Sequence, residues 1–298
     1  AVDRVAIGYS SQMTASAGGN TSVGKWTLYS NTAGNLTAIG RDSLFSNTTG
    51  GYNVAVGYAS LRSNTTGGFN TATGYQALYT NTTGEKSTAF GSQALYSNTT
   101  GFRNSAMGNS ALYNNTTGSN NAANGYLALN TNTTGGFNTA VGSLSGAANS
   151  TGNSNTSIGY SALRYNTGSN NTASGVYSLE DNTTGYSNTA TGYGASHANT
   201  TGYENVASGF YSLQNNTTGV RNVAIGTNAL QANTTQGYTV AIGYNSLKSQ
   251  PAAYQNTAVG GFSLQNNTAG SPNTAVGFNS LQANTTGSSN TAVGGSAL

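Results

Sequence analysis

The sequence predicts an all-β protein, a parallel β-solenoid of about 17 coils with 17 residues in each coil. Three observations support this. A unit of about 17 residues recurs along the whole chain, Gly occupies its fourth position in all eighteen copies, and Leu occupies its eighth position in fifteen of them. Self-similarity at a fixed short period indicates an array in which each copy adds one stacked unit.

Numbering each copy from its first residue defines the columns used below, and residues 274–290 form a clear example. The copies start at Val5, Thr21, Thr37, Val54, Thr71, Thr88, Ser105, Ala122, Thr139, Thr156, Thr172, Thr189, Val206, Val223, Val240, Thr257, Thr274 and Thr291. The copies that begin at Val5, Thr21 and Thr156 have sixteen residues. We therefore predict an irregular N-terminal coil over 1–20 and a repeat array over 21–298 whose last copy is incomplete.

Columns one to four predict the main strand of each coil. Column one is mostly Thr or Val, which favour strands, and column two is always Ala or Ser. Alternate residues of a strand share a face. Columns two and four therefore form a stripe of small side chains where another backbone can approach, and the mixed, often aliphatic column three is expected to be half-buried.

Columns six to nine predict a second short strand, with the column-eight Leu as the main apolar anchor. A polar turn, commonly Asn-Thr-Thr-Gly, follows. Column eleven is Asn in nearly every full copy, and a second Asn row closes many copies, as at Asn53, Asn70 and Asn104. Amides stacked one strand spacing apart can form hydrogen-bonded ladders.

The predicted core is thin. Each coil supplies one Leu, one Val or Ile and some Ala, and burial of a Leu or Val stabilises a fold by only about 1.5–3 kcal/mol. Ordering each residue costs on the order of 1–2 kcal/mol in backbone entropy. We therefore expect the chain to associate with copies of itself, through the small-residue stripe and column three.

The composition argues against several partners. Charged residues make up 5% of the chain, and the nine Lys and Arg residues are isolated from one another. Because nucleic-acid binding requires clustered basic residues, no nucleic acid is expected. No apolar run approaches the length of about eighteen residues that a membrane span needs, so no membrane insertion is expected.

Candidate catalytic residues are sparse. The chain has no Cys, and its single histidine, His197 in column nine, has Glu180 as the nearest acid in an adjacent copy. Metal binding and acid–base catalysis need further partners, so we interpret this pair as a surface contact between coils. Glu180 and Asp181 are neighbours that would point to opposite faces of a strand. We predict no enzymatic activity, no catalytic or metal-binding residues and no cofactor.

Asn-Thr-Thr also matches the acceptor signal for N-glycosylation. The candidate acceptors are Asn47, Asn64, Asn81, Asn98, Asn115, Asn132, Asn182, Asn199, Asn216, Asn233 and Asn284. Glycans would make a weakly charged fibre more soluble. The alternative, which we favour, is that Asn serves the ladder and Thr-Thr-Gly serves the turn.

Aromatic residues form two rows. Column five carries Tyr58 and Tyr75 among others, and column nine carries Tyr79, Tyr96 and Tyr113. Rows of exposed rings suit contact with a glycan or receptor, or packing between chains. We favour packing between chains and keep glycan binding as the alternative.

The motif Asn-Thr-Ala-Val-Gly, at 138–142, 256–260, 273–277 and 290–294, resembles the head repeats of YadA-like trimeric autotransporter adhesins. The fuller unit, with Leu and then Asn-Thr-Thr-Gly, is similar to repeats of bacteriophage tail fibres and bacterial surface fibres. This resemblance covers Val5 to Leu298. It implies a left-handed β-roll, a homotrimer, and an extracellular location on a cell surface or virion.

The leading hypothesis is a non-catalytic structural and adhesive fibre segment, from a phage tail-fibre shaft or a bacterial adhesin. Its partners would be copies of itself and a cell-surface carbohydrate or receptor. One alternative is an extracellular filament subunit that stacks end to end. Another is an ice- or surface-binding solenoid, although Thr-Ala-Thr occurs only at 71–73 and 189–191.

Overall fold

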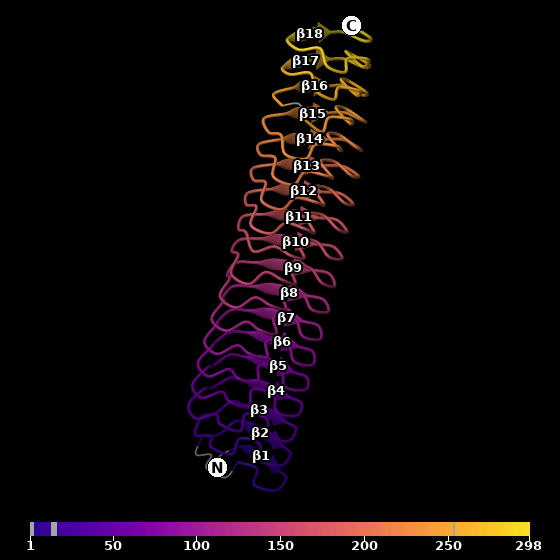
Figure 1. Cartoon of the computed structure of the whole chain (residues 1–298). Helices are drawn as coiled ribbons and strands as arrows, with labels where there is room; N and C mark the ends of the chain where they lie inside the picture. Colours follow the sequence, from indigo (N-terminus) through magenta and orange to yellow (C-terminus); the bar gives the residue numbers. More distant parts are fainter. Residues whose placement is uncertain (1–2, 13–16, 253) are drawn as a thin grey trace. The chain divides into compact units, whose positions relative to one another are not determined.

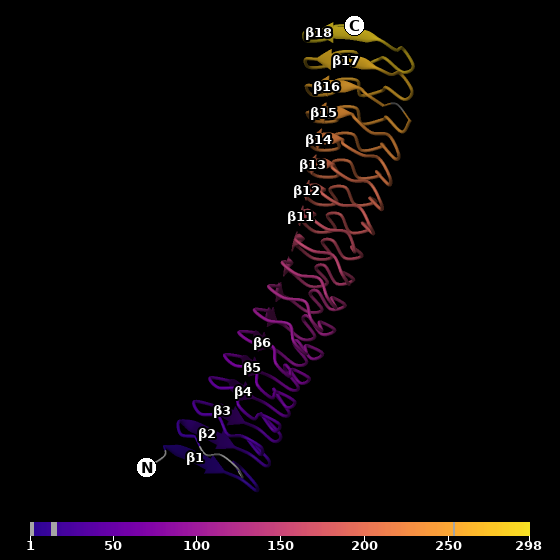
Figure 2. The same ribbon diagram turned by 90° about the vertical axis from the view of Figure 1, so that its left-hand side faces the viewer.

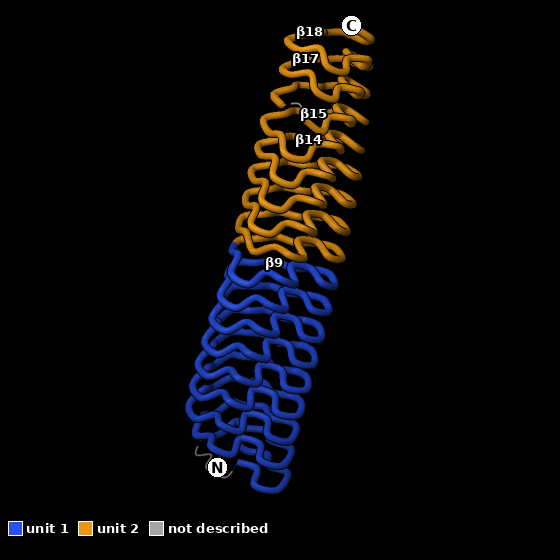
Figure 3. The backbone as a smooth tube through the Cα atoms, in the orientation of Figure 1, with its two compact units in different colours: residues 1–153 blue, residues 154–298 orange. Residues whose placement is uncertain are grey.

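A computed structural model describes residues 3–12, 17–252 and 254–298 of the 298-residue chain. In these ranges the protein is all-β and contains no helix, and one short strand opens each repeat (Figure 1). The strands pair in parallel, so the fold is a parallel β-solenoid of about 17 turns. The chain forms two compact units, Ala1–Asn153 and Ser154–Leu298 (Figure 3).

The strands of the first unit are β1 to β9. Their bounds are β1 Arg4–Ile7, β2 Asn20–Val23, β3 Thr37–Ile39, β4 Val54–Val56, β5 Thr71–Thr73, β6 Thr88–Phe90, β7 Ser105–Met107, β8 Ala122–Asn124 and β9 Thr139–Val141. Residues 1–2 and 13–16 of the predicted irregular coil lie outside the described residues. Within that coil, β1 pairs with β2 along its whole length.

The strands of the second unit are β10 to β18. Their bounds are β10 Thr156–Ile158, β11 Thr172–Ser174, β12 Thr189–Thr191, β13 Val206–Ser208, β14 Val223–Ile225, β15 Val240–Ile242, β16 Thr257–Val259, β17 Asn273–Val276 and β18 Asn290–Val293. In each unit the strands follow one another in sequence order (Figure 2).

Strand pairing follows the repeat. Ala55 pairs with Ala72, seventeen residues on, while Ser22 pairs with Ala38 and Ser157 with Ala173, sixteen residues on. The shorter copies are therefore accommodated without a shift of register. Since a one-residue slip would turn every side chain to the opposite face, equal columns stack throughout each unit, as the sequence predicts.

The second strand predicted at columns six to nine is wrong. These residues form turns, because columns six and eight take left-handed backbone angles. In one coil Gln76 has φ of 54° and Leu78 has φ of 51°. A third left-handed position occurs at column sixteen, where Lys86 has φ of 58°. Left-handed residues cannot continue a β-strand, so the coil bends sharply at each of them.

Backbone hydrogen bonds between coils nevertheless continue through these bends. The amide of Gln76 donates to the carbonyl of Tyr58 in the preceding coil, and the amide of Leu78 donates to the carbonyl of Ala94 in the next. The amides of Thr82, Thr83 and Gly84 all donate to the carbonyl of Thr99. Neighbouring coils thus satisfy buried backbone groups that strand pairing alone would leave unpaired.

The interior of each coil is built from Leu, Ala and Asn. Column-eight Leu residues and column-two Ala residues are fully buried and form the hydrophobic core of each unit, as for Leu78 and Ala72. Column three lies mostly outside, with Ile39 40% exposed and Phe90 60% exposed. The predicted interface along the small-residue stripe is therefore wrong for column two, whose Ala side chains face the interior of the chain's own coil.

The column-four Gly allows the coils to stack. Gly40 has φ of 118°, and a Cβ there would lie 2.5 Å from the carbonyl oxygen of Gly57 in the next coil. A side chain would therefore be excluded both by the backbone angle and by the neighbouring coil. The positive φ recurs in all eighteen copies and explains why the column is always Gly, even at Gly294, where no following coil lies against it.

Candidate functional site

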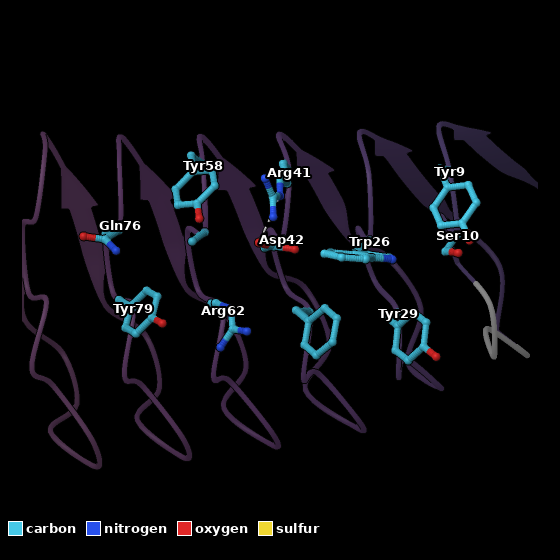
Figure 4. A pocket seen from close by; sticks show the side chains of 12 residues that line it. Tyr9, Ser10, Trp26, Tyr29, Arg41, Asp42, Tyr58, Arg62, Gln76 and Tyr79 are labelled. Atoms are coloured by element: carbon cyan, nitrogen blue, oxygen red, sulfur yellow. Dashed lines mark ion pairs between the residues drawn. The ribbon is translucent and has the colours of Figure 1, made fainter.

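Two rows of aromatic and cationic side chains border a groove on the outside of the first unit (Figure 4). Its volume is about 690 Å³. One border comes from column five, the other comes from column nine, and column six lies between them. The lining residues are Tyr9, Ser10, Trp26, Tyr29, Arg41, Asp42, Phe45, Tyr58, Ala59, Arg62, Gln76 and Tyr79. We call this the aromatic groove.

The column-nine border is a continuous stack. The rings of Tyr29 and Phe45 are 5.1 Å apart and nearly parallel. The guanidinium of Arg62 follows, with its central carbon 5.2 Å from the Phe45 ring and 5.8 Å from the Tyr79 ring. Equal columns of successive coils lie one strand spacing apart, about 4.8 Å, so each planar group stacks on the next.

The stack continues beyond the groove through the predicted tyrosines. Tyr79 and Tyr96 have ring centroids 5.1 Å apart, and Tyr96 and Tyr113 have centroids 5.0 Å apart. Burial raises the pKa of the Tyr96 phenol, and its neighbours Tyr113, Tyr79 and Tyr75 raise it further. The phenol is therefore held in its neutral form to a higher pH than usual.

The second border has a mixed composition. The ammonium of Lys25 lies 4.1 Å from the ring centroid of Trp26, and the guanidinium of Arg41 lies between the rings of Trp26 and Tyr58, at 5.5 and 5.8 Å. Tyr58 stacks on Tyr75, with centroids 5.5 Å apart. Contact with the aromatic rings orders the aliphatic part of these Lys and Arg side chains, while their charged groups remain at the surface.

Asp42 lies on the floor between the two borders. The residue is 5% exposed, and its Oδ2 lies 3.5 Å from the Nε of Arg41. Its Oδ1 is buried and has no hydrogen-bond donor among the described residues. An unpaired buried carboxylate oxygen is unusual, because desolvating it without a donor is costly. Asp42 therefore has unused capacity to accept a hydrogen bond, at an oxygen that the protein encloses.

The same columns form a smaller groove, of about 310 Å³, on the second unit. There the Nε2 of His197 lies 3.1 Å from a Glu180 carboxylate oxygen and its Nδ1 lies 3.6 Å from Asp181. The contact between His197 and Glu180 is confirmed. The expected divergence of Glu180 and Asp181 is wrong, because both carboxylates reach the same imidazole from the turn that replaces the predicted strand.

The candidate glycosylation residues belong to the predicted ladder, which is confirmed. Asn81 donates from Nδ2 to the Oδ1 of Asn64 at 2.7 Å and to the carbonyl of Gly84, and its own Oδ1 accepts from Asn98 at 2.8 Å. The ladder residues Asn47, Asn64, Asn81, Asn98, Asn115, Asn132, Asn182, Asn199, Asn216 and Asn233 are fully buried, while Asn284 is half-buried. Burial and bonding of the amide nitrogen support the ladder interpretation of the motif.

The structure brings the predicted tyrosines to two different places. Tyr58 and Tyr79 line the aromatic groove, Tyr75 stacks beside it, and Tyr96 and Tyr113 continue its column-nine border. The sequence reading missed Trp26, Arg41 and Asp42. Their shared position in columns five and six was a usable signal, but only the turn geometry shows that these columns face column nine.

The fold defines a class of protein, a parallel β-solenoid repeat protein of the β-roll kind. No family model matches the chain, and no curated protein matches it either. Within the described residues, no helix is long and apolar enough to cross a membrane, and no group of three or more His, Cys, Asp or Glu side chains could hold a metal ion.

Proposed function

We propose that the protein is a non-catalytic structural and adhesive segment of an extracellular fibre, on a cell surface or a virion, whose chains associate side by side. The observation that carries this proposal is the outward face of the strands, formed by columns one and three, which we call the sheet face. Its positions carry no charged residue in any of the eighteen strands. Interface centres are depleted of charge in this way, whereas exposed surfaces of monomers are not.

The sheet face is uncharged and partly apolar, since column one is mostly Thr or Val and column three is aliphatic or aromatic in many strands. In the first unit Phe90 is 60% exposed and Met107 42%, and in the second unit Ile158 is 43% exposed and Ile225 40%. Apolar side chains that are exposed along a sheet in this way are typical of association sites. The best occupant is a second copy of the chain, because an identical sheet has the same spacing of strands and side chains. Three copies, as in the fibres that the repeat resembles, would cover every such face.

The mass of the protein in solution tests the proposal. Light scattering should give three times the chain mass of 30.0 kDa. Phe90→Glu places a charge on the sheet face and should reduce the mass. Phe69→Glu is the matched control, because Phe69 is 59% exposed but lies in a turn outside the sheet face, so this variant should keep the wild-type mass.

Other masses would contradict the proposal in recognisable ways. A wild-type monomer of 30.0 kDa would exclude side-by-side association. Long filaments in electron micrographs that persist in Phe90→Glu would favour end-to-end stacking instead. Thermal hysteresis by a monomer would favour ice binding, although only β5 and β12 present two Thr on the sheet face.

A further inference from the structure

We propose that the aromatic groove of the first unit binds an extended glycan that carries carboxylate groups, such as a chain of uronic acids. This inference rests on the adhesive part of the function proposed above and specifies its ligand. Three features of the groove support it: aromatic rings, two guanidinium groups, and a carboxylate with an oxygen that lacks a donor.

The rings suit the apolar faces of pyranose sugars. Tyr29, Tyr58 and Tyr79 are seen face-on from the open side of the groove, while Trp26 lies edge-on between the two borders (Figure 4). Aromatic side chains offer rigid platforms that combine an apolar face with a polar tip. The groove spans five successive coils, from Tyr9 to Tyr79, or about 20 Å at the usual strand spacing. That length suits an oligosaccharide better than a single sugar.

The cations specify a negative charge on the ligand. Arg62 points into the groove from column nine, and within the described residues no acidic side chain pairs with it. Arg41 is half exposed and lines the opposite border. A guanidinium donates two parallel hydrogen bonds to a carboxylate. Contact with the rings of Phe45 and Tyr79 orders the Arg62 guanidinium before a ligand arrives, so less rotamer entropy is lost on binding.

Asp42 would accept a hydrogen bond from a hydroxyl group of the sugar. Its Oδ1 lacks a donor, and the partner of its other oxygen, Arg41, is the side chain that a carboxylate ligand would draw outward. A hydroxyl that enters beside Arg41 would then donate to Oδ2, the oxygen that Arg41 leaves. A simple polyanion has neither a hydroxyl donor for Asp42 nor a sugar ring to contact the aromatic side chains. The combination therefore favours a carboxylated sugar over phosphate or an acidic peptide.

The second unit supplies an internal control. Its smaller groove is lined by Tyr177, Tyr193 and Tyr211 but has Glu180 and His197 in place of arginines. The lining of this groove thus has rings but no guanidinium group, and Arg164, in column nine of the preceding coil, is paired with Glu180. A ligand that needed only aromatic rings would use both grooves, whereas a carboxylated glycan should select the first.

The test is titration calorimetry of the full chain with tetragalacturonate, with neutral maltotetraose and poly-glutamate as comparison ligands. Tetragalacturonate should bind best. Arg62→Gln and Trp26→Ala should each weaken its binding roughly tenfold or more, as expected for loss of a charged hydrogen bond or of an apolar contact between the two borders. Tyr211→Ala, in the second groove, should leave binding unchanged. Thermal melts and light scattering of each variant identify any that fails to fold or to associate.

Each other outcome overturns the inference. Equal binding of poly-glutamate, with no effect of Trp26→Ala, would show non-specific charge attraction. Equal binding of maltotetraose, with no effect of Arg62→Gln, would show that the groove does not recognise the carboxylate groups of the glycan. No binding to a chain that retains its wild-type mass would refute the glycan site while leaving the fibre proposal intact. Selective binding of tetragalacturonate by a monomeric chain would support the glycan site and refute side-by-side association.

Discussion

At the scale of single residues, the coil depends on side chains whose roles differ from their usual ones. Leu61, Leu78 and Leu95 are core residues that also hold φ of 49° to 53°. For residues other than Gly, left-handed angles cost roughly 1–2 kcal/mol each. The burial of the Leu side chain offsets this cost, and the backbone bonds to the next coil fix the angle. Leu fills this position in fifteen copies, whereas Gln12, Gly146 and Ser196 keep the left-handed angle without the apolar side chain.

The asparagine ladder gives the sharpest prediction at this scale. Asn81→Ala removes one donor and one acceptor from the fully buried ladder and leaves the Nδ2 of Asn98 without its ladder acceptor. We expect the free energy of unfolding, measured by urea titration, to fall by about 1–3 kcal/mol.

The matched control for this change is Thr83→Ala in the same turn. Thr83 is exposed, and its loss destroys the acceptor signal Asn81-Thr82-Thr83 without touching the ladder. Thr83→Ala should keep the wild-type stability. The opposite outcome would be that Thr83→Ala destabilises protein prepared from its native source as much as Asn81→Ala does, whereas neither change destabilises unglycosylated protein. A glycan rather than the ladder would then be the reason for the motif.

At the scale of elements, ladders of identical side chains act as the links between coils. Each strand has only three or four residues, too few to be stable as an isolated pair. Amide ladders inside and aromatic stacks outside add contacts in register with the strands. The stack from Tyr79 to Tyr113 is one such ladder, and it joins three coils of the first unit.

This stack predicts a dependence of stability on pH. The Tyr96 pKa is raised in the folded protein above its ordinary value of 10.0, chiefly by burial. An unfolded chain therefore ionises this phenol first. The stabilisation that Tyr96 contributes is fully present below pH 10 and is lost as the pH rises through the folded pKa. Melting temperatures measured from neutral pH upward should fall less steeply above pH 10 for Tyr96→Phe than for the wild type.

The exposed Tyr126 provides the comparison, since Tyr126→Phe removes a surface hydroxyl from another coil. The melting temperatures of Tyr126→Phe should follow those of the wild type at every pH. Parallel curves for the wild type and Tyr96→Phe above pH 10 would show that ionisation of this phenol does not weaken the stack.

At the scale of the whole molecule, every coil is joined mainly to the coils before and after it. Stability in such arrays is close to a sum of repeat and neighbour contributions. Among the residues that the structure describes, each unit has a single core of Leu and Ala, with no second layer that could distribute a defect. Damage in one unit should therefore remain in that unit.

Leu78→Ala tests this expectation by hydrogen exchange. The buried Leu78 belongs to the core of the first unit, and its loss should cost about 2–5 kcal/mol. Amides of β4 to β6 should exchange faster, whereas those of β12 to β16 should keep their wild-type protection. Uniform loss of protection in both units would indicate that the chain unfolds as one cooperative body.

Much of this architecture was predictable from the sequence. The period, the strand at columns one to three, the register of the sixteen-residue copies and the Asn ladder all follow from side-chain identity at fixed spacing. The aromatic rows were predictable for the same reason. The meeting of Trp26, Arg41 and Asp42 with Tyr79 was not, because residues in columns six and nine come together only through the bends between them.

The sequence by itself thus determined which residues stack along the array, because parallel pairing repeats whatever stands seventeen residues earlier. Only the tertiary structure decided which columns face inward. A stripe of Ala and an aliphatic column look equally suited to a core, and alternation along a strand cannot tell one face from the other. The left-handed turns at columns six and eight settle the matter by folding Leu78 onto Ala72 and leaving column three outside.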